Sequence, residues 1–377
     1  MTSPSVMIIA GDISGDVHAS GVVRELWSDF PEMNIWGIGG PKMQAEGFSA
    51  LLPFEPFNRM GFLEVISHLP FFLSAKKLVI DEMKSRRPDC LILVDYPGFN
   101  MPVMKAAHSL GIPVLWYIAP MVWAWKRKRA EVLGKLATHI ACIFPFEVQY
   151  FTPFTSSVSF VGNPLMESVS KISGKKDSLD EGEIDLAIVP GSRAQEVKKM
   201  LPEMISAYWI LKECYPRVKA RVSRCGPVSE QFYRDAIRGT DANLFDGNLR
   251  ELLRRSDLAL VTSGTATLET ALEGVPMVIA YRTSMVTYHI FKRLLRIPHI
   301  GLPNIIAGER IVPECIQEKS DAEQMAAELQ GYIENPETYR STLSRLSGLR
   351  DLLGSKKPSR EVSDIAGEII RRSVAGR

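Results

Sequence analysis

The chain has few cysteines, and its first residues do not resemble a signal peptide. Both observations limit the classes of protein to which it can belong. Only 5 of its 377 residues are cysteine, and no two have the Cys-x-x-Cys spacing of a zinc or redox site. An odd number of widely spaced cysteines argues against a disulfide framework and fits a reducing, cytoplasmic setting. The first apolar run, Val6–Ala10, is too short for the core of a signal peptide, and no basic segment precedes it.

An excess of charge of one sign is also missing. Lys and Arg number 45 and Asp and Glu number 43, which gives a net charge of +2. This balance argues against binding of a polyanion by the surface as a whole, so we expect no nucleic-acid partner. Apolar residues make up 46% of the chain, which is typical of a globular protein and excludes disorder, collagen and coiled coil. At roughly 150 residues per domain, the length predicts two domains or at most three.

One stretch is long enough to cross a membrane but has the wrong composition. Twenty residues between Lys105 and Lys126 carry no formal charge, about the length of a membrane-spanning helix. Gly111, Pro113 and Pro120 interrupt the stretch, and its middle is typical of a β-strand. We therefore interpret it as a buried strand of a sheet, and expect the protein to be soluble or to rest on a membrane surface.

Short, continuous apolar runs alternate with helical patterns and predict two Rossmann-like, doubly wound α/β domains. The predicted strands are Val6–Ala10, Asn34–Ile38, Cys90–Val94, Pro113–Ile118, His139–Phe144, Asp185–Val189, Arg217–Val222, Asp257–Val261 and Pro276–Tyr281. The predicted helices are Ala19–Phe30, Gln195–Leu211, Ala322–Ile333 and Arg360–Arg372.

A polar segment without periodicity divides the chain and predicts the domain boundaries. The first domain is expected at 1–165, the linker at 166–183 and the second domain at 184–354, with a carboxyl-terminal helix at about 355–377 as a candidate to pack back on the first domain. Ligands of such folds bind at the carboxyl ends of the strands, so we expect the site in a cleft between the two domains.

Two acidic residues follow predicted strands of the first domain. Asp12 lies in a glycine-containing turn at the start of a helix, where turn formation and helix capping are the alternative interpretation. Asp95 ends a central apolar strand, where an acid gains nothing from packing, and we favour a functional role over helix capping. The glycines at 37–40 lack the spacing of a dinucleotide fingerprint, which makes a nicotinamide enzyme a weak interpretation.

In the second domain, two strand ends lead into helices with small, hydroxylated or basic residues. Arg193 follows Pro-Gly-Ser and offers a cation whose shape suits phosphate. Ser263, Gly264 and Thr265 form a second anion cradle, and Glu269, one turn later, can accept two ribose hydroxyls. Two cradles predict a diphosphate and hence a nucleotide-linked substrate, although capping alone could explain either one.

The last candidate site is a segment that combines aromatic and basic residues. A charge run is usually a solvated helix face, but here the cations adjoin two tryptophans, an arrangement typical of a membrane interface. Further large apolar residues precede it, and together they would suit an acylated, phosphorylated substrate. The residues predicted to contact lipid or acceptor are Met60, Phe62, Trp123, Trp125, Lys126, Arg127, Lys128 and Arg129.

Seven segments, in order, resemble those of the lipid-A-disaccharide synthase family of inverting glycosyltransferases. They are GGPKMQAEGF (39–48), MGFLEV (60–65), PMVWAWKRKR (120–129), FPFE (144–147), PGSR (190–193), SGTATLE (263–269) and LPNIIAGERIVPE (302–314). The resemblance implies a GT-B fold, with two Rossmann-like domains facing a cleft and the nucleotide on the second. It implies transfer of 2,3-diacylglucosamine from UDP-2,3-diacylglucosamine to the 6-hydroxyl of 2,3-diacylglucosamine 1-phosphate, in lipopolysaccharide biosynthesis.

The resemblance also implies roles for individual residues. The family's essential carboxylate corresponds to Asp95, its acidic first turn to Asp12, its arginine to Arg193 and the asparagine of its LPN motif to Asn304. No cofactor is implied, and because the chain has no Asp-x-Asp triplet we expect no metal. The expected setting is the anionic inner face of the inner membrane, as a peripheral protein, and a homodimer is left open.

Three positions depart from the family pattern. Asp12 replaces the usual Glu and keeps its charge, Gly98 replaces an Asp, and Asn163 replaces a His. The alternative within this fold is another enzyme acting on a UDP-sugar, either a UDP-N-acetylglucosamine 2-epimerase or a lipid-linked N-acetylglucosaminyltransferase. A nucleotide or lipid sensor without catalytic activity is a more distant alternative.

Overall fold

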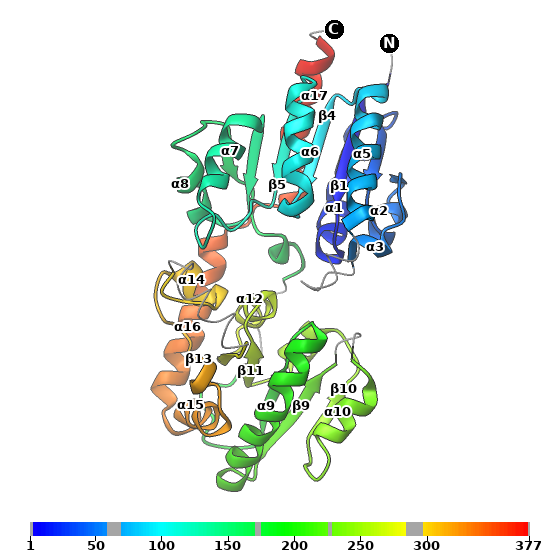
Figure 1. The fold of residues 1–377 in the computed structure, drawn as a ribbon. Helices are drawn as coiled ribbons and strands as arrows, with labels where there is room; N and C mark the ends of the chain where they lie inside the picture. Colours follow the sequence, from blue (N-terminus) through cyan, green and yellow to red (C-terminus); the bar gives the residue numbers. More distant parts are fainter. Residues whose placement is uncertain (1–2, 59–68, 170–174, 225–227, 284–296, 376–377) are drawn as a thin grey trace. The chain divides into compact units, whose positions relative to one another are not determined.

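The computed structural model describes residues 3–58, 69–169, 175–224, 228–283 and 297–375. The chain divides into two units (Figure 1). Unit 1 contains Met1–Glu167 and Ser355–Arg377, and unit 2 contains Ser168–Gly354. The carboxyl-terminal segment therefore returns to the first unit.

Unit 1 is built on a sheet of seven parallel strands in the order β3-β2-β1-β4-β5-β6-β7. The strands are β1 Ser5–Ala10, β2 Asn34–Ile38, β3 Ser49–Ala50, β4 Cys90–Val94, β5 Val114–Tyr117, β6 His139–Cys142 and β7 Val158–Phe160. The central strands β1, β4 and β5 are almost entirely apolar because helices cover both faces of the sheet. Met7 and Ile9 pack into one layer, and Val6, Ile8 and Ala10 pack into the other.

Two helical layers cover this sheet. Helix α17 packs against α1 on one face, and Figure 1 shows α5 and α6 on the other. The helices are α1 Ile13–Asp29, α2 Pro41–Ala45, α3 Glu55–Asn58, α5 Leu69–Arg86, α6 Pro97–Ser109, α7 Lys128–Leu136, α8 Val148–Phe151 and α17 Pro358–Ala375, with 3-10 turns η1 Pro145–Glu147 and η2 Pro164–Ser168.

Unit 2 has a sheet of six parallel strands in the order β10-β9-β8-β11-β12-β13. The strands are β8 Ile184–Val189, β9 Val218–Ser223, β10 Asn243–Phe245, β11 Leu258–Thr262, β12 Met277–Tyr281 and β13 Glu314–Ile316. The helices are α9 Ala194–Cys214, α10 Glu230–Ala236, α11 Leu249–Arg254, α12 Thr265–Leu272, α14 Leu302–Ala307, α15 Ala322–Glu334 and α16 Pro336–Leu353, with a 3-10 turn η3 Gln317–Lys319.

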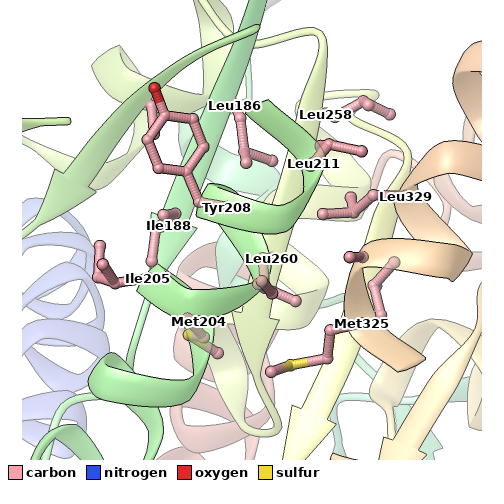
Figure 2. Packing of buried hydrophobic residues seen from close by; sticks show 14 of the residues in the cluster. Leu186, Ile188, Met204, Ile205, Tyr208, Leu211, Leu258, Leu260, Met325 and Leu329 are labelled. Atoms are coloured by element: carbon pink, nitrogen blue, oxygen red, sulfur yellow. The ribbon is translucent and has the colours of Figure 1, made fainter. Parts of the chain in front are cut away.

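One of the two core layers of unit 2 lies between its sheet and the helices α9 and α15 (Figure 2). Leu186 and Ile188 of β8 contact the apolar face of α9, where Met204 lies, and α15 contributes Met325 and Leu329. Each of these side chains is essentially inaccessible to solvent. Burial of one such side chain stabilises the fold by about 1.5–3 kcal/mol.

In both units the strand order reverses at one point, and that point locates the candidate sites. In unit 1 the reversal lies between β1 and β4, which pair in register through Ala10 and Val94. In unit 2 it lies between β8 and β11, which pair through Val189 and Val261. Ligands of open parallel sheets bind at such switch points, because the two flanking loops diverge there and leave a crevice.

The predicted parallel α/β architecture is confirmed, and every predicted strand corresponds to a strand of the structure. The short edge strands β3, β7, β10 and β13 and the helix α16 were not predicted. No helix within the described part of the chain combines the length and apolarity needed to cross a membrane.

Candidate active site

The end of β4 holds Asp95 in an unusual backbone conformation. Asp95 and Tyr96 have φ angles of 43° and 50°, in the left-handed region that costs a non-glycine residue about 1 kcal/mol or more. The fully buried Asn100 supports this turn, because its Nδ2 donates to the carbonyl oxygens of Val94 (3.2 Å) and Asp95 (2.8 Å). The turn is therefore held by a dedicated side chain on the following helix.

Asp12 occupies the matching position after β1. It is the N-cap of α1, and its Oδ1 accepts a hydrogen bond from the Gly15 backbone N–H at 2.7 Å. The two turns interlock, because a Cβ atom at Gly11 would lie only 2.7 Å from the ring of Tyr96. Glycine at position 11 is thus required for the Asp12 and Asp95 turns to lie side by side.

The surroundings of Asp95 raise its pKa from the ordinary 3.8 to about 7. Burial is the main cause, because it disfavours the charged form, and the negative charge of Asp12 adds to it. A hydrogen bond from the Tyr96 backbone N–H and the positive charge of Arg129 act in the opposite direction. A carboxyl with a pKa near neutrality suits proton transfer at physiological pH.

The aromatic and basic segment divides into buried and exposed parts. Trp125 is half-buried, and its ring lies under Lys126 Nζ at 4.4 Å and beside the Arg129 guanidinium at 5.6 Å. The charges of Arg129 and Asp95 also act on each other, since the positive charge of Arg129 lowers the pKa of Asp95. Arg127 and Lys128 point into solvent. The cations are therefore not equivalent, because Arg129 is half-buried and its charge acts on Asp95, whereas the other three are exposed.

Trp123 requires a correction. It was expected at a lipid-facing surface, but only 3% of it is exposed, and its Nε1 donates to Glu147 Oε1 at 3.1 Å. Its indole therefore packs inside unit 1 and does not face a lipid. Met60 and Phe62, assigned to the same surface, lie outside the described residues.

The structure gives a physical setting to the two other positions that depart from the family pattern. Asn163 is 2% exposed; its Nδ2 donates to the Ile143 carbonyl oxygen at 3.3 Å and its Oδ1 accepts from the Leu165 N–H at 3.0 Å. Gly98 is exposed, and a Cβ atom there would meet no atom within 4 Å. Asn163 thus joins two chain segments, whereas position 98 has room for a larger side chain.

In unit 2, Arg193 lies at the start of α9, directly after β8. Its side chain is 76% exposed, and its Nη1 contacts Glu196 Oε1 at 3.1 Å. Gly191 has a φ of 119° and approaches Glu196 so closely that a Cβ atom would lie 2.9 Å from that side chain. The loop from β8 to α9 therefore depends on glycine and presents Arg193 outward.

Ser263, Gly264 and Thr265 follow the neighbouring strand β11. Ser263 Oγ donates to the Ile300 carbonyl oxygen at 3.1 Å, and Gly264, with a φ of 155°, is the N-cap of α12. Gly264 and Thr265 are exposed. Because the first N–H groups of a helix have no partner within it, this end of α12 can donate to an anion.

Glu269 lies one turn further along α12. It is half-buried, and burial raises its pKa while the charge of Arg250 lowers it. Its Oε2 lies 3.9 Å from Arg250 Nε. The carboxylate thus stays close to a cation and retains an oxygen that could accept from a hydroxyl.

Asn304 also requires a correction. It was expected to bind UDP, but it is fully buried and its amide is saturated within the chain. Its Oδ1 accepts from the N–H groups of Ile311 (2.8 Å) and Val312 (3.0 Å). Its Nδ2 donates to the Val312 carbonyl oxygen (2.9 Å) and to Glu314 Oε1 (2.8 Å). Asn304 therefore orders the segment before β13 and has no group left for a ligand.

The predicted residues thus form one set in each unit. Asp12, Asp95 and Arg129 come together at the β1–β4 switch point, and Arg193 and Ser263–Thr265 follow the two strands of the β8–β11 switch point. Sequence reasoning missed Asn100 and Glu147. Glu147 stands in a motif that carried the family resemblance, but nothing in the local pattern assigned it a role.

Solved structures with the same arrangement define the class of protein. CalG4, the calicheamicin glycosyltransferase, has a TM-score of 0.63 at 14% identity, with 99% of each chain covered. The UDP-GlcNAc 2-epimerase from Neisseria meningitidis bound to UDP-GlcNAc has a TM-score of 0.61 at 14% identity, covering 99% of this chain and 100% of that one. The fold is that of the GT-B class, as predicted.

Sequence comparison then gives the family. The model of the family described as lipid-A-disaccharide synthetase matches residues 6–362. The lipid-A-disaccharide synthase of Geobacter sulfurreducens is 36% identical over 380 residues, 99% of each chain, and that of Neisseria gonorrhoeae is 32% identical over 378 residues, 98% of this chain and 96% of its own. The chain belongs to the lipid-A-disaccharide synthetase family, whose members are hexosyltransferases, and the predicted enzyme class is confirmed.

Proposed function

We propose that the enzyme transfers 2,3-diacylglucosamine from UDP to the 6-hydroxyl of 2,3-diacylglucosamine 1-phosphate, releasing UDP. The product is the β-1,6-linked disaccharide 1-phosphate. Membership of the family supports this reaction. The observation that carries it is the buried, strained Asp95 with a pKa near 7, placed at a switch point beside a cation.

Asp95 acts as the general base. Its carboxylate takes the proton of the acceptor hydroxyl while the oxygen attacks the anomeric carbon, and the bond from that carbon to the diphosphate breaks with its electron pair leaving on UDP. Attack from the face opposite the diphosphate inverts the configuration. Asp12 contributes by keeping the pKa of Asp95 high, which makes the carboxylate a stronger base.

Arg129 holds the acceptor phosphate. Its guanidinium is half-buried beside Asp95, so an anion bound there would lie close to the base. Lys126, Arg127 and Lys128 remain exposed, and with Trp125 they provide cations and an indole for the anionic surface of the inner membrane on its cytoplasmic side. The enzyme would then be peripheral and take its acylated substrates from the lipid surface.

Unit 2 holds the donor. Arg193 and the exposed start of α12 would bind the diphosphate and stabilise the negative charge that grows on it as the sugar departs. Glu269 would accept from ribose hydroxyls, and Asn304 orders the chain nearby without touching the ligand. Fixed cations and helix dipoles supply the electrostatic stabilisation in this scheme.

A reconstituted reaction tests the proposal. The protein is incubated with UDP-2,3-diacylglucosamine and 2,3-diacylglucosamine 1-phosphate, and the product is analysed by mass spectrometry together with released UDP. Disaccharide phosphate and UDP in equal amounts are expected. UDP release without disaccharide, or epimerisation of UDP-N-acetylglucosamine at C2, would assign the chain another reaction on the same fold.

A further inference from the structure

Glu147 is a buried carboxylate that the proposed mechanism does not use. It lies in η1, after β6, and is 1% exposed. Its pKa is raised to about 8, mainly by burial and in smaller part by the negative charge of Asp95. A charge withdrawn from water in this way is costly unless donors surround it.

Three donors converge on this carboxylate. Trp123 Nε1 donates to Oε1 at 3.1 Å, and the backbone N–H groups of Ile143 and Phe144 donate to Oε2 at 3.2 and 3.1 Å. Each of these groups can only donate, so the three hydrogen bonds favour the ionised form and lower the pKa, although burial outweighs them. Glu147 therefore joins the end of β6 to Trp123, which lies 24 residues earlier in the chain.

Trp123 belongs to the segment that joins β5 to α7, here called the 118–127 segment. This segment leaves β5 through Ile118 at a φ of 63° and enters α7 through Lys126 at a φ of 51°. The Trp116 Nε1 donates to the Ile118 carbonyl oxygen at 3.1 Å at one end. Further along the segment, the indole of Trp123 donates its hydrogen bond to Glu147 and packs edge-on against the ring of Phe146, with the ring centroids 5.4 Å apart.

We propose that Glu147 is a positioning residue that, through Trp123, holds the 118–127 segment so that the Trp125 ring stays against Arg129, the cation whose charge acts on Asp95. The segment is not part of a helix or strand; backbone turns such as Trp125 N–H to the Met121 carbonyl oxygen (3.2 Å) shape it, and the side chain of Trp123 anchors it to Glu147. The charged groups that face Asp95 are Asp12, Arg129 and Glu147 itself. The inference rests on the proposed function for its kinetic readout, because Arg129 is there assigned to the acceptor phosphate.

Two variants remove the same hydrogen bond from its two ends. Trp123→Phe deletes the donor and keeps an aromatic ring, and Glu147→Gln replaces one carboxylate oxygen by an NH₂ group, which donates and cannot accept. We expect each to raise the KM for the acceptor about tenfold, as for loss of a hydrogen bond to a charged group. The KM for UDP-2,3-diacylglucosamine should stay unchanged. The double variant should resemble each single one, because both break one interaction.

The pH profile is the readout that a merely structural role would not move. If Arg129 moves away from Asp95, the pKa of Asp95 rises, so the acid limb of turnover should shift to higher pH in Trp123→Phe. Glu147→Gln also removes a negative charge that acts on Asp95, so its acid limb should lie below that of Trp123→Phe. The matched control is Asp89→Asn. Asp89 is also a 2% exposed carboxylate, accepts the Ser5 N–H at 2.9 Å, and precedes β4 at the opposite end of the same sheet. It should lower the melting temperature without changing the acceptor KM or the acid limb.

Indole NMR of the full chain separates failure of this inference from failure of the proposed function. In ¹⁵N-labelled protein, Glu147→Gln should shift the Trp123 and Trp125 indole N–H resonances, whereas Asp89→Asn should leave both in place. A Trp125 resonance that does not move, or an unchanged acceptor KM and acid limb in an active Trp123→Phe variant, overturns the positioning role. If the wild-type protein makes no disaccharide but the indole resonances shift in Glu147→Gln, the positioning role stands and the proposed reaction is refuted.

Discussion

Replacing Asp12 by Asn should move the acid limb of the pH–rate profile to lower pH. The negative charge of Asp12 raises the pKa of Asp95, so its removal makes Asp95 easier to ionise. Asparagine keeps the N-cap of α1, because its side-chain oxygen can still accept the hydrogen bond from Gly15. The substitution therefore changes a charge and leaves the local fold in place.

The size of the effect follows from the pKa of Asp95. At a pKa of about 7, the carboxyl is about one-half ionised at pH 7 and about one-tenth ionised at pH 6. Wild-type turnover should therefore fall about tenfold for each pH unit well below 7, whereas a carboxyl with its ordinary pKa would stay ionised. Burial remains the larger cause of the shift, so the limb of the Asp12→Asn variant should still lie above the ordinary range.

Initial rates of UDP release from pH 5 to pH 9, at constant ionic strength, measure the limb. Arg129→Met should move it in the opposite direction, because the cation that lowers the pKa of Asp95 is lost, and Arg127→Met should leave it in place because that side chain is exposed. Titration of the acceptor phosphate is common to the wild-type protein, Asp12→Asn and Arg127→Met, so differences among these three isolate the enzyme. A limb that stays fixed in both Asp12→Asn and Arg129→Met would show that Asp95 is not the titrating group.

Three further substitutions test other parts of the account. Arg193→Ala should weaken UDP binding about tenfold or more by calorimetry, with exposed Lys198→Ala on the same helix as a control; unchanged affinity contradicts the diphosphate role. Gly98→Asp should raise the free energy of unfolding by about 0.5–1 kcal/mol in denaturant titrations, since the position is open, and should shift the acid limb upward; destabilisation would show that the site is not open. Asn304→Ala should lower the free energy of unfolding by at least about 2 kcal/mol, because two buried N–H groups lose their acceptor. The folded variant should keep its affinity for UDP, and a stable variant that no longer binds UDP would return Asn304 to the donor site.

Asp95 also gives stability a defined pH dependence. Its pKa in the folded protein is raised above the ordinary 3.8, so between about pH 4 and pH 7 the folded protein keeps a proton that the unfolded chain has released. The contribution of Asp95 to the free energy of unfolding therefore falls as pH rises through this window and is constant above it. In Asp95→Asn, which lacks the titrating carboxyl, the free energy of unfolding should lose this decline between about pH 4 and pH 7.

The central strands and the acidic strand ends could be predicted because their signals are local. Strands such as β4, Cys90–Val94, are buried on both faces and therefore show an unbroken apolar run. Edge strands such as β3, Ser49–Ala50, are too short to show one. An acid directly after a central strand lies at the carboxyl end of the sheet, independent of the conformation of the following loop. Asp95 could therefore be identified from the sequence.

Side-chain burial in loops could not be predicted, because it depends on distant partners. Trp123 is buried and donates a hydrogen bond to Glu147, and the side-chain oxygen of Asn304 accepts hydrogen bonds from the backbone N–H groups of Ile311 and Val312. A tryptophan before a basic run is typical of a membrane interface, and nothing within the run indicates that its indole turns inward. The left-handed turn at Asp95, and its support by Asn100, likewise appear only in the folded chain.

The most direct test of the account is the turnover of Asp95→Asn measured together with its affinity for UDP. If Asp95 is the general base, turnover should fall at least about a hundredfold, the low end for such a group, with UDP binding as in the wild-type protein. Turnover close to the wild-type value would remove Asp95 from the chemistry and contradict the mechanism.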